Sequence, residues 1–222
     1  MQYSTFAAID IGSYDVILEI FEISKKQGIR SVDKICHRME LGKDTYTLGK
    51  IRPEMEEELC RVLADFVRIM EGYRVDDYRA AASSAISEAS NSLYVLGKIH
   101  QLTGLSVTVL SNSEQRFLSY KALAAMEDNF NKIIEKGTAI LDLDGGSFQI
   151  SLFDKDALVT TQNIRMGSLR IRERLAGIQS ETEHYEEMVE ELIWNEVSSF
   201  KKMYLKDRKI ENIMLIGDVF TD

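Results

Sequence analysis

Two short stretches of the sequence combine aspartate, glycine and serine in a way that suits phosphate chemistry. In each, an apolar run ends in an aspartate, a glycine–serine turn follows, and an alternating apolar run returns. The first set is Asp10, Gly12 and Ser13, and the second is Asp142, Gly145, Gly146 and Ser147. Such turns expose backbone N–H groups that can hold phosphate oxygens. The aspartate can hold a divalent cation or orient an attacking water.

The same residue pairs also have an ordinary explanation. Asp-Gly and Gly-Ser are common in simple hairpin turns, so one copy alone favours a structural role. Two copies at equivalent places favour a phosphate site. Two such turns facing each other across a cleft would grip an oligophosphate from both sides, with Asp10 and Asp142 near the cation.

The strands and helices that position these turns can be predicted from hydrophobic periodicity. Alternating apolar residues predict strands, and apolar residues at helical spacing predict helices. The predicted strands are residues 6–11, 16–23, 29–39, 78–84, 105–111, 138–144, 147–154, 157–166 and 211–218. The predicted helices are residues 51–73, 85–104, 113–128, 168–177 and 182–204. Both halves therefore run strand, strand, strand, helix, strand, which indicates an internal duplication.

The duplication predicts an α/β fold with two similar domains. We expect residues 1–130 to form the first, with the first phosphate turn, and residues 131–222 to form the second, with the Asp-Gly-Gly-Ser turn. The first half continues with two helices and a strand after its fourth strand, whereas the second stops there. The second domain is thus expected to be incomplete in this chain.

Composition excludes several classes of protein. The formal net charge of −9 argues against a broad nucleic-acid-binding surface, although local backbone amides can still hold one anion. No apolar run is long enough to span a bilayer, and the N-terminus lacks a signal-peptide pattern. Cys36 and Cys60 lack zinc or redox spacing, and Cys60 is expected to be a buried thiol. These features favour a cytoplasmic protein.

Six motifs, in order, carry a resemblance to one family. "AAIDIGSYD" resembles its Asp-x-Gly-Ser-Asn-Ser turn, "RMELGKDTYTLGKIRPE" its Arg-Leu-Gly segment, and "AASSAISEASN" its Ala-Thr-Ser-Ala-Leu-Arg-Glu-Ala-x-Asn segment. "LSNSEQRFLSY" resembles Ser-Gly-x-Glu-Glu-Ala, "LDLDGGSFQI" Asp-x-Gly-Gly-Gly-Ser-Thr-Glu, and "RMGSLRIRERL" Gly-x-x-Arg. The chain therefore resembles the exopolyphosphatase / guanosine pentaphosphate phosphohydrolase family, within the actin-like ATPase and sugar-kinase fold group.

The resemblance implies two actin-like (ribonuclease H-like) domains with mixed five-stranded sheets and the site between them. It also implies hydrolysis of terminal phosphoanhydrides of polyphosphate or guanosine pentaphosphate, with Mg²⁺ as cofactor and a homodimer as the assembly. Carried over by position, Asp10 and Asp142 are the metal ligands. The implied phosphate-binding residues are Gly12, Ser13, Gly145, Gly146 and Ser147.

The chain departs from the family pattern at the catalytic positions. The second glutamate of Ser-Gly-x-Glu-Glu, thought to activate the attacking water, aligns with Gln115, and the glutamate ending the glycine-rich turn aligns with Gln149. Glutamine cannot accept a proton at neutral pH, and general-base help is worth about 10²–10⁴-fold in rate. Glu114 lies beside Gln115, but neighbours on a helix point about 100° apart. An alignment shifted by one residue would instead place Glu114 at the catalytic position.

Three functions remain open on the sequence alone. The first is an active hydrolase of phosphoanhydrides that uses the residues above. The second is a degenerate relative that binds a phosphate-rich ligand, or another protein, without turnover. The third is an actin-like or kinase-like ATPase, which the order of the motifs disfavours.

Overall fold

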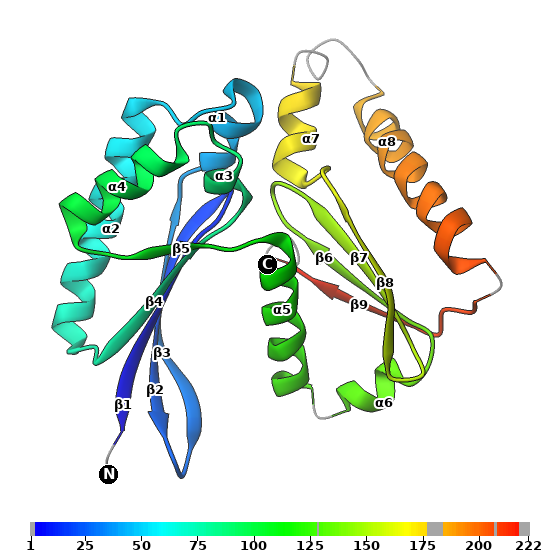
Figure 1. Cartoon of the computed structure of the whole chain (residues 1–222), viewed down its shortest axis with the longest axis horizontal. Helices are drawn as coiled ribbons and strands as arrows, with labels where there is room; N and C mark the ends of the chain where they lie inside the picture. Colours follow the sequence, from blue (N-terminus) through cyan, green and yellow to red (C-terminus); the bar gives the residue numbers. More distant parts are fainter. Residues whose placement is uncertain (1–2, 128, 177–183, 207, 218–222) are drawn as a thin grey trace. The chain divides into compact units, whose positions relative to one another are not determined.

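The computed structural model describes residues 3–127, 129–176, 184–206 and 208–217 (Figure 1). Its contacts divide the chain into two compact units, Met1–Ser111 and Asn112–Asp222. The division lies ahead of a helix that the sequence-based prediction placed in the first domain. The assignment of residues 1–130 and 131–222 to two domains stays a prediction.

The first unit is built on a five-stranded mixed sheet with the order β3-β2-β1-β4-β5. Strands β1 to β3 are antiparallel neighbours, and β4 and β5 are added in parallel. In chain order its elements are β1 (Ser4–Ile11), β2 (Asp15–Ser24), β3 (Gly28–Arg38), α1 (Leu41–Leu48), α2 (Pro53–Tyr73), β4 (Asp77–Ala82), α3 (Ser84–Ser87), α4 (Ser92–Thr103) and β5 (Val107–Val109).

The second unit repeats this topology on a four-stranded sheet, β8-β7-β6-β9, in which β9 is parallel to β6. Its elements are α5 (Asn112–Met126), α6 (Phe130–Ile134), β6 (Thr138–Leu143), β7 (Phe148–Asp154), β8 (Ala157–Ile164), α7 (Ser168–Leu175), α8 (Tyr185–Phe200), a π-helical turn (Lys201–Leu205) and β9 (Asn212–Ile216). The expected α/β fold with a mixed five-stranded sheet and an incomplete second sheet is confirmed.

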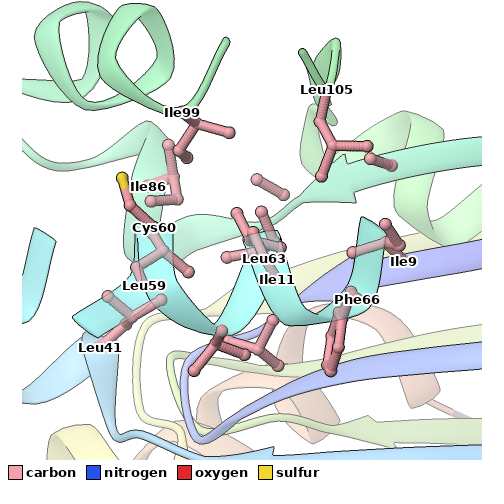
Figure 2. Close-up of a cluster of buried hydrophobic side chains, with 14 of the residues drawn as sticks. Ile9, Ile11, Leu41, Leu59, Cys60, Leu63, Phe66, Ile86, Ile99 and Leu105 are labelled. Atoms are coloured by element: carbon pink, nitrogen blue, oxygen red, sulfur yellow. The ribbon is translucent and has the colours of Figure 1, made fainter. Parts of the chain in front are cut away.

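The core of the first unit lies on one face of its sheet. Alternate residues of β1, among them Ile9 and Ile11, pack under Leu63 of α2 and under Ile99, which lies in α4 (Figure 2). The period of two along a strand places these side chains together on one face. Met70, near the end of α2, belongs to the same cluster.

In the second unit, apolar clusters lie on both faces of the sheet. Phe148, Ile150 and Phe200 belong to the cluster on the face covered by α8. Phe130 and Ile140 belong to the cluster on the opposite face, beside α5 and α6. The sheet therefore lies between two helical layers. The layer that contains α5 covers the face of the sheet on which Asp142 lies.

Two secondary-structure predictions were wrong in detail. The helix predicted over residues 85–104 is split into α3 and α4, because Asn91 bonds away from the helix: its Nδ2 donates to Ile51 O and to Glu56 Oε1, both at 2.8 Å. These long-range bonds hold Asn91 at the N-cap of α4, ahead of its first turn. The strand predicted over 105–111 is reduced to β5. Residues 128, 177, 182, 183 and 218, at the ends of four predicted elements, lie outside the described residues.

Candidate functional site

The two aspartate-led turns have the same hairpin geometry, each within its own unit. Asp10 pairs with Ile17 across β1 and β2, and Asp142 pairs with Gln149 across β6 and β7. Each hairpin is closed by one bond at the same place: Gly12 N–H donates to Asp15 O at 2.9 Å, and Asp144 N–H donates to Ser147 O at 3.0 Å. Because loop length fixes the register of a hairpin, both aspartates occupy equivalent positions.

The backbone of the second turn is held from one side by the start of α7. Ser168 N–H donates to Asp144 O at 3.2 Å, and Arg170 N–H donates to Gly145 O at 3.0 Å. The side chain of Arg170 adds a bond from its Nε to Gly146 O at 2.9 Å. Three successive carbonyl groups of the turn therefore point towards α7.

This arrangement sets the direction of the turn's amides. The structure has no cis peptide bond among its described residues, and in a trans peptide the N–H points opposite to the C=O of the preceding residue. The N–H groups of Gly145, Gly146 and Ser147 consequently point away from α7. A run of amides pointing one way suits binding of an anion.

The first turn is held in a related way by α1 and the residues before it. Gly42 N–H donates to Ser13 O, and the N–H groups of Met39 and Glu40 donate to Tyr14 O, all at 2.9 Å. The N–H groups of Tyr14 and Asp15 therefore point away from α1 and from the residues that precede it. Carbonyls of both turns accept from a helix that follows the third strand of the unit.

The side chain of Ser13 is buried within the first unit. Only 1% of Ser13 is exposed, and its Oγ is hydrogen-bonded to Tyr46 Oη at 2.6 Å and lies 3.4 Å from Ser84 Oγ. Tyr46 Oη is in turn 2.8 Å from Ser84 Oγ. The three hydroxyls link the turn to α1 and α3. Asp10, the expected metal ligand of this turn, is exposed at the end of β1.

In the second unit, a polar layer separates α5 from the sheet. Asp142, Gln149 and Asn163 form one row across β6, β7 and β8, because directly paired residues share a face. Ser119 Oγ of α5 donates to Asp142 Oδ2 at 3.1 Å. Gln115 lies one turn before Ser119 and so shares its face of the helix.

Arg116 forms several hydrogen bonds in the same polar layer, next to the row of Asp142, Gln149 and Asn163. Its Nη1 donates to Gln149 Oε1 at 3.3 Å and to Thr161 Oγ1 at 3.0 Å, and its Nη2 donates to Ser113 Oγ at 3.1 Å. One turn further along α5, the hydroxyl of Tyr120 donates to Ser151. Burial raises the pKa of Tyr120, which keeps this hydroxyl protonated.

A small pocket opens in this layer, with a volume of about 10 Å³. It is lined by residues of α5, the second turn and the three-strand row: Asn112, Gln115, Asp142, Asp144, Ser147, Gln149 and Asn163. A volume of this size has room for about one water molecule. A phosphate group would therefore have to bind at the mouth of the pocket, on the turn.

The pocket brings together four of the candidate site residues, Gln115, Asp142, Ser147 and Gln149, and it separates Gln115 from Glu114. Gln115 lines the pocket, whereas Glu114 is exposed and is not part of the lining. Sequence reasoning missed Asn112 and Asn163 of the pocket lining, and it missed Ser119 and Arg116, which bond to Asp142 and Gln149. The spacing of Gln115 and Ser119 on one helix face was the signal that could have identified Ser119.

The donor atoms of the pocket suit a hard cation. Within the described residues no cluster of three or more His, Cys, Asp or Glu side chains could hold a metal ion. Two carboxylates, Asp142 and Asp144, nevertheless line the pocket together with Asn163, whose buried Oδ1 has no hydrogen-bond partner there. Carboxylate and amide oxygens are the protein ligands that Mg²⁺ prefers. The residues present therefore fit a weakly held Mg²⁺ at the mouth of the pocket, where it would keep several of its waters.

The fold defines the class of this protein: two similar α/β units with the actin-like topology. A sequence model of the Ppx/GppA phosphatase family matches residues 19–221, and the chain belongs to that family. The match contains α5 and the second turn, whereas the first turn precedes it.

Known relatives are distant and longer. The chain is 22% identical over 174 residues to the bifunctional 3-dehydroquinate synthase/phosphatase of Fusobacterium nucleatum, covering 76% of this chain and 26% of that protein. It is 25% identical over 144 residues to exopolyphosphatase 1 of Mycobacterium leprae, covering 64% of this chain and 41% of that protein. The crystal structure of the Aquifex aeolicus Ppx/GppA family member superposes with a TM-score of 0.71 at 23% identity, covering 97% of this chain and 67% of that one.

No helix in the described residues is long and apolar enough to cross a membrane.

Proposed function

We propose that this chain binds the terminal phosphates of inorganic polyphosphate or guanosine pentaphosphate and does not hydrolyse them efficiently. One observation carries the proposal: the two residues that flank Asp142 in the pocket, Gln115 and Gln149, are both amides. An amide can position a water or a phosphate oxygen, but it cannot take a proton from water at neutral pH.

Binding uses parts of the site that are intact. The Gly145, Gly146 and Ser147 amides point the same way and can donate to phosphate oxygens. In the corresponding turn of the first unit, Gly12 N–H is bonded to Asp15 O, so the amides of Tyr14 and Asp15 are the ones proposed to take the same role. Asp142, with Asp144 and Asn163, would hold Mg²⁺. When bound, this ion would offset the negative charge of the phosphates. A homodimer and a cytoplasmic location stay predictions.

The test measures binding and turnover separately. Phosphate release from polyphosphate and from guanosine pentaphosphate is followed with Mg²⁺ for the natural chain and for two variants, Gln115→Glu and Gln101→Glu. Gln101→Glu is the control, because it adds the same charge at an exposed residue of α4. We expect binding by all three proteins, and release that rises about 10²-fold or more only in Gln115→Glu. Robust release by the natural chain would contradict the absence of efficient hydrolysis, and failure to bind either compound would contradict the binding itself.

A second candidate function is slow hydrolysis with Asp144 as the base. Asp144 stands where the family pattern has a glycine, it lines the same pocket as Gln115, and it lies two residues after Asp142 on the same face of the hairpin. A carboxylate there could accept the proton that Gln115 cannot. Asp144→Asn would then abolish any residual phosphate release, measured at polyphosphate concentrations that saturate both the variant and the natural chain.

A further inference from the structure

A half-buried arginine lies in the polar layer between α5 and the sheet of the second unit. Arg116 donates three side-chain hydrogen bonds there, to Gln149, Thr161 and Ser113, and each of these acceptors is a neutral oxygen. A guanidinium group stays protonated in proteins, so Arg116 always carries its positive charge. These three partners satisfy its N–H groups without balancing that charge.

The charge of Arg116 lies beside the small pocket. Gln149, one of its three acceptors, lines the pocket together with Asp142 and Asp144. These two carboxylates repel a phosphate group at the mouth, and a positive charge close to them reduces that repulsion. Arg116 supplies such a charge from within the fold, whether or not a divalent cation is bound.

A second arginine at the site, Arg170, lies behind the glycine-rich turn. Its Nε donates to Gly146 O at 2.9 Å, on the side of the turn that is held by α7. The amides proposed to hold phosphate point away from that side. Arg170 therefore supports the turn from the back, whereas Arg116 bonds to a residue of the pocket lining.

Arg116 also determines which end of the Gln149 amide faces the pocket. A guanidinium group has only N–H donors, so the atom of Gln149 that lies 3.3 Å from Nη1 must be the carbonyl oxygen Oε1. Thr161, another acceptor of Arg116, lies two residues before Asn163, on the same face of β8 and further from the turn. Oε1 is thus drawn away from the turn, and the amide nitrogen Nε2 is left to face the turn and the pocket.

The pocket offers a matching acceptor for a water bound by this nitrogen. It has room for about one water, and Asn163, which pairs directly with Gln149, has a buried Oδ1 without a hydrogen-bond partner in the described part of the chain. A water there can accept from Gln149 Nε2 and donate to Asn163 Oδ1 and to a phosphate oxygen at the mouth. Buried waters typically make about three such bonds. A water-mediated contact is nearly as favourable in enthalpy as a direct one.

The two residues of this pair depart from the family pattern together. The pattern Ser-Gly-x-Glu-Glu-Ala has alanine at the position of Arg116, and the glycine-rich turn has glutamate at the position of Gln149. An arginine beside a glutamate would form an ion pair, which would neutralise its charge. Beside a glutamine it keeps that charge. Relative to the pattern, the layer has thus lost one negative charge and gained one positive charge.

We propose that Arg116 allows this chain to hold the terminal phosphates of a polyphosphate without a divalent cation. The inference rests on the proposed function, because it concerns the same site and ligand. Arg116 is a positioning residue: its charge offsets those of Asp142 and Asp144, and its bond to Gln149 directs the amide N–H, through the pocket water, to a phosphate oxygen. Bound Mg²⁺ adds a second positive charge, so it strengthens binding without being required for it.

Calorimetry with inorganic tripolyphosphate, once in EDTA and once in Mg²⁺, tests this role. We expect the natural chain to bind in both buffers. Arg116→Gln should raise the dissociation constant in EDTA about tenfold or more, and should raise it less in Mg²⁺, because the ion then offsets the two carboxylates. Gln149→Met keeps the charge of Arg116 but removes the amide, so it should also weaken binding in EDTA. Lys121→Gln, which removes the same charge from an exposed residue of α5, is the matched control and should change either constant less than about twofold.

The comparison of the two buffers separates this role from a purely structural one. If Arg116→Gln only loosens α5, both dissociation constants rise by the same factor and the melting temperature falls, and the inference is overturned. Equal losses in Arg116→Gln and Lys121→Gln would overturn it too, because they would reflect the overall charge of the chain. Binding by the natural chain in Mg²⁺ but not in EDTA would overturn the inference and leave the proposed function intact. Absence of binding in both buffers would overturn the two together.

Discussion

Gly167, at the N-cap of α7, lies against the backbone of Gly145 in the second turn. A Cβ built on Gly167 would lie 2.4 Å from the carbonyl carbon of Gly145 and 2.3 Å from the carbonyl oxygen of Asp144. Both are closer than any real contact with a methyl group. The glycine therefore lets the first N–H groups of α7 reach the turn's carbonyls, which in turn aligns the amides proposed to hold phosphate.

Gly167→Ala should weaken phosphate binding by displacing the second turn. The added methyl group must push the turn away from α7, which lengthens the bonds from Ser168 and Arg170 and misaligns the amides. We expect the dissociation constant for polyphosphate to rise about tenfold or more, measured by calorimetry. Gly97→Ala is the matched control: its Cβ meets open space within α4, and the change should stabilise the fold by about 0.5–1 kcal/mol. Equal affinity in both variants would show that the turn does not hold the ligand.

The sequence predicted the turns and the topology better than it predicted the contacts around them. The hairpin register that pairs Asp142 with Gln149 follows from a strand ending in aspartate and a short glycine turn, which are local features. The position of α5 over the sheet depends on tertiary packing instead. The bonds of Ser119 to Asp142 and of Arg116 to Gln149 therefore could not be read from periodicity. The break at Asn91 was missed for the same reason, because its partners lie 35 to 40 residues away.

Asp44 should be a strong contributor to the stability of the first unit. It is 1% exposed, its Oδ2 accepts from the backbone N–H of Arg52 at 2.9 Å, and its Oδ1 lies 2.8 Å from the guanidinium of Arg52. Asp44→Ala leaves the N–H at the start of α2 without its acceptor, so the free energy of unfolding should fall by about 1–3 kcal/mol. Urea denaturation measures this change. Asp65→Ala, which removes an exposed pair with Arg68 on the surface of α2, should cost at most about 0.5 kcal/mol. Similar losses in the two variants would contradict the special role of Asp44.

The two cysteines should react with a thiol reagent at very different rates. Cys36 is exposed on β3, whereas Cys60 is buried in α2 as the sequence predicted. Burial raises the pKa of the Cys60 thiol. The reactive thiolate is thus scarce at Cys60, and access to it is limited as well. At pH 8 we expect one fast reaction that Cys36→Ser abolishes, and a second reaction only after denaturation.

The same pKa shift predicts a direction for stability against pH. The folded-state pKa of Cys60 lies above that of the unfolded chain, so the protonated thiol stabilises the fold fully below the unfolded value. This contribution is lost as the pH rises through the folded value. The free energy of unfolding should therefore decrease more steeply with rising alkaline pH in the natural chain than in Cys60→Ala. Parallel curves for the two proteins would contradict the shift.

Gln149→Glu should strengthen Mg²⁺ binding in the pocket. The new carboxylate would lie opposite Asp142 and within reach of Arg116, whose Nη1 is 3.3 Å from Gln149 Oε1. A charge-assisted bond from Arg116 would keep it ionised and oriented. A third carboxylate beside Asp142 and Asp144 then favours a divalent cation, because ligand charge raises affinity for such ions. We expect calorimetry with Mg²⁺ alone to show binding about tenfold tighter than that of the natural chain. Gln162→Glu, one residue before Asn163 and on the opposite face of β8, should leave Mg²⁺ binding unchanged. If the two variants bind Mg²⁺ alike, the cation does not occupy this pocket.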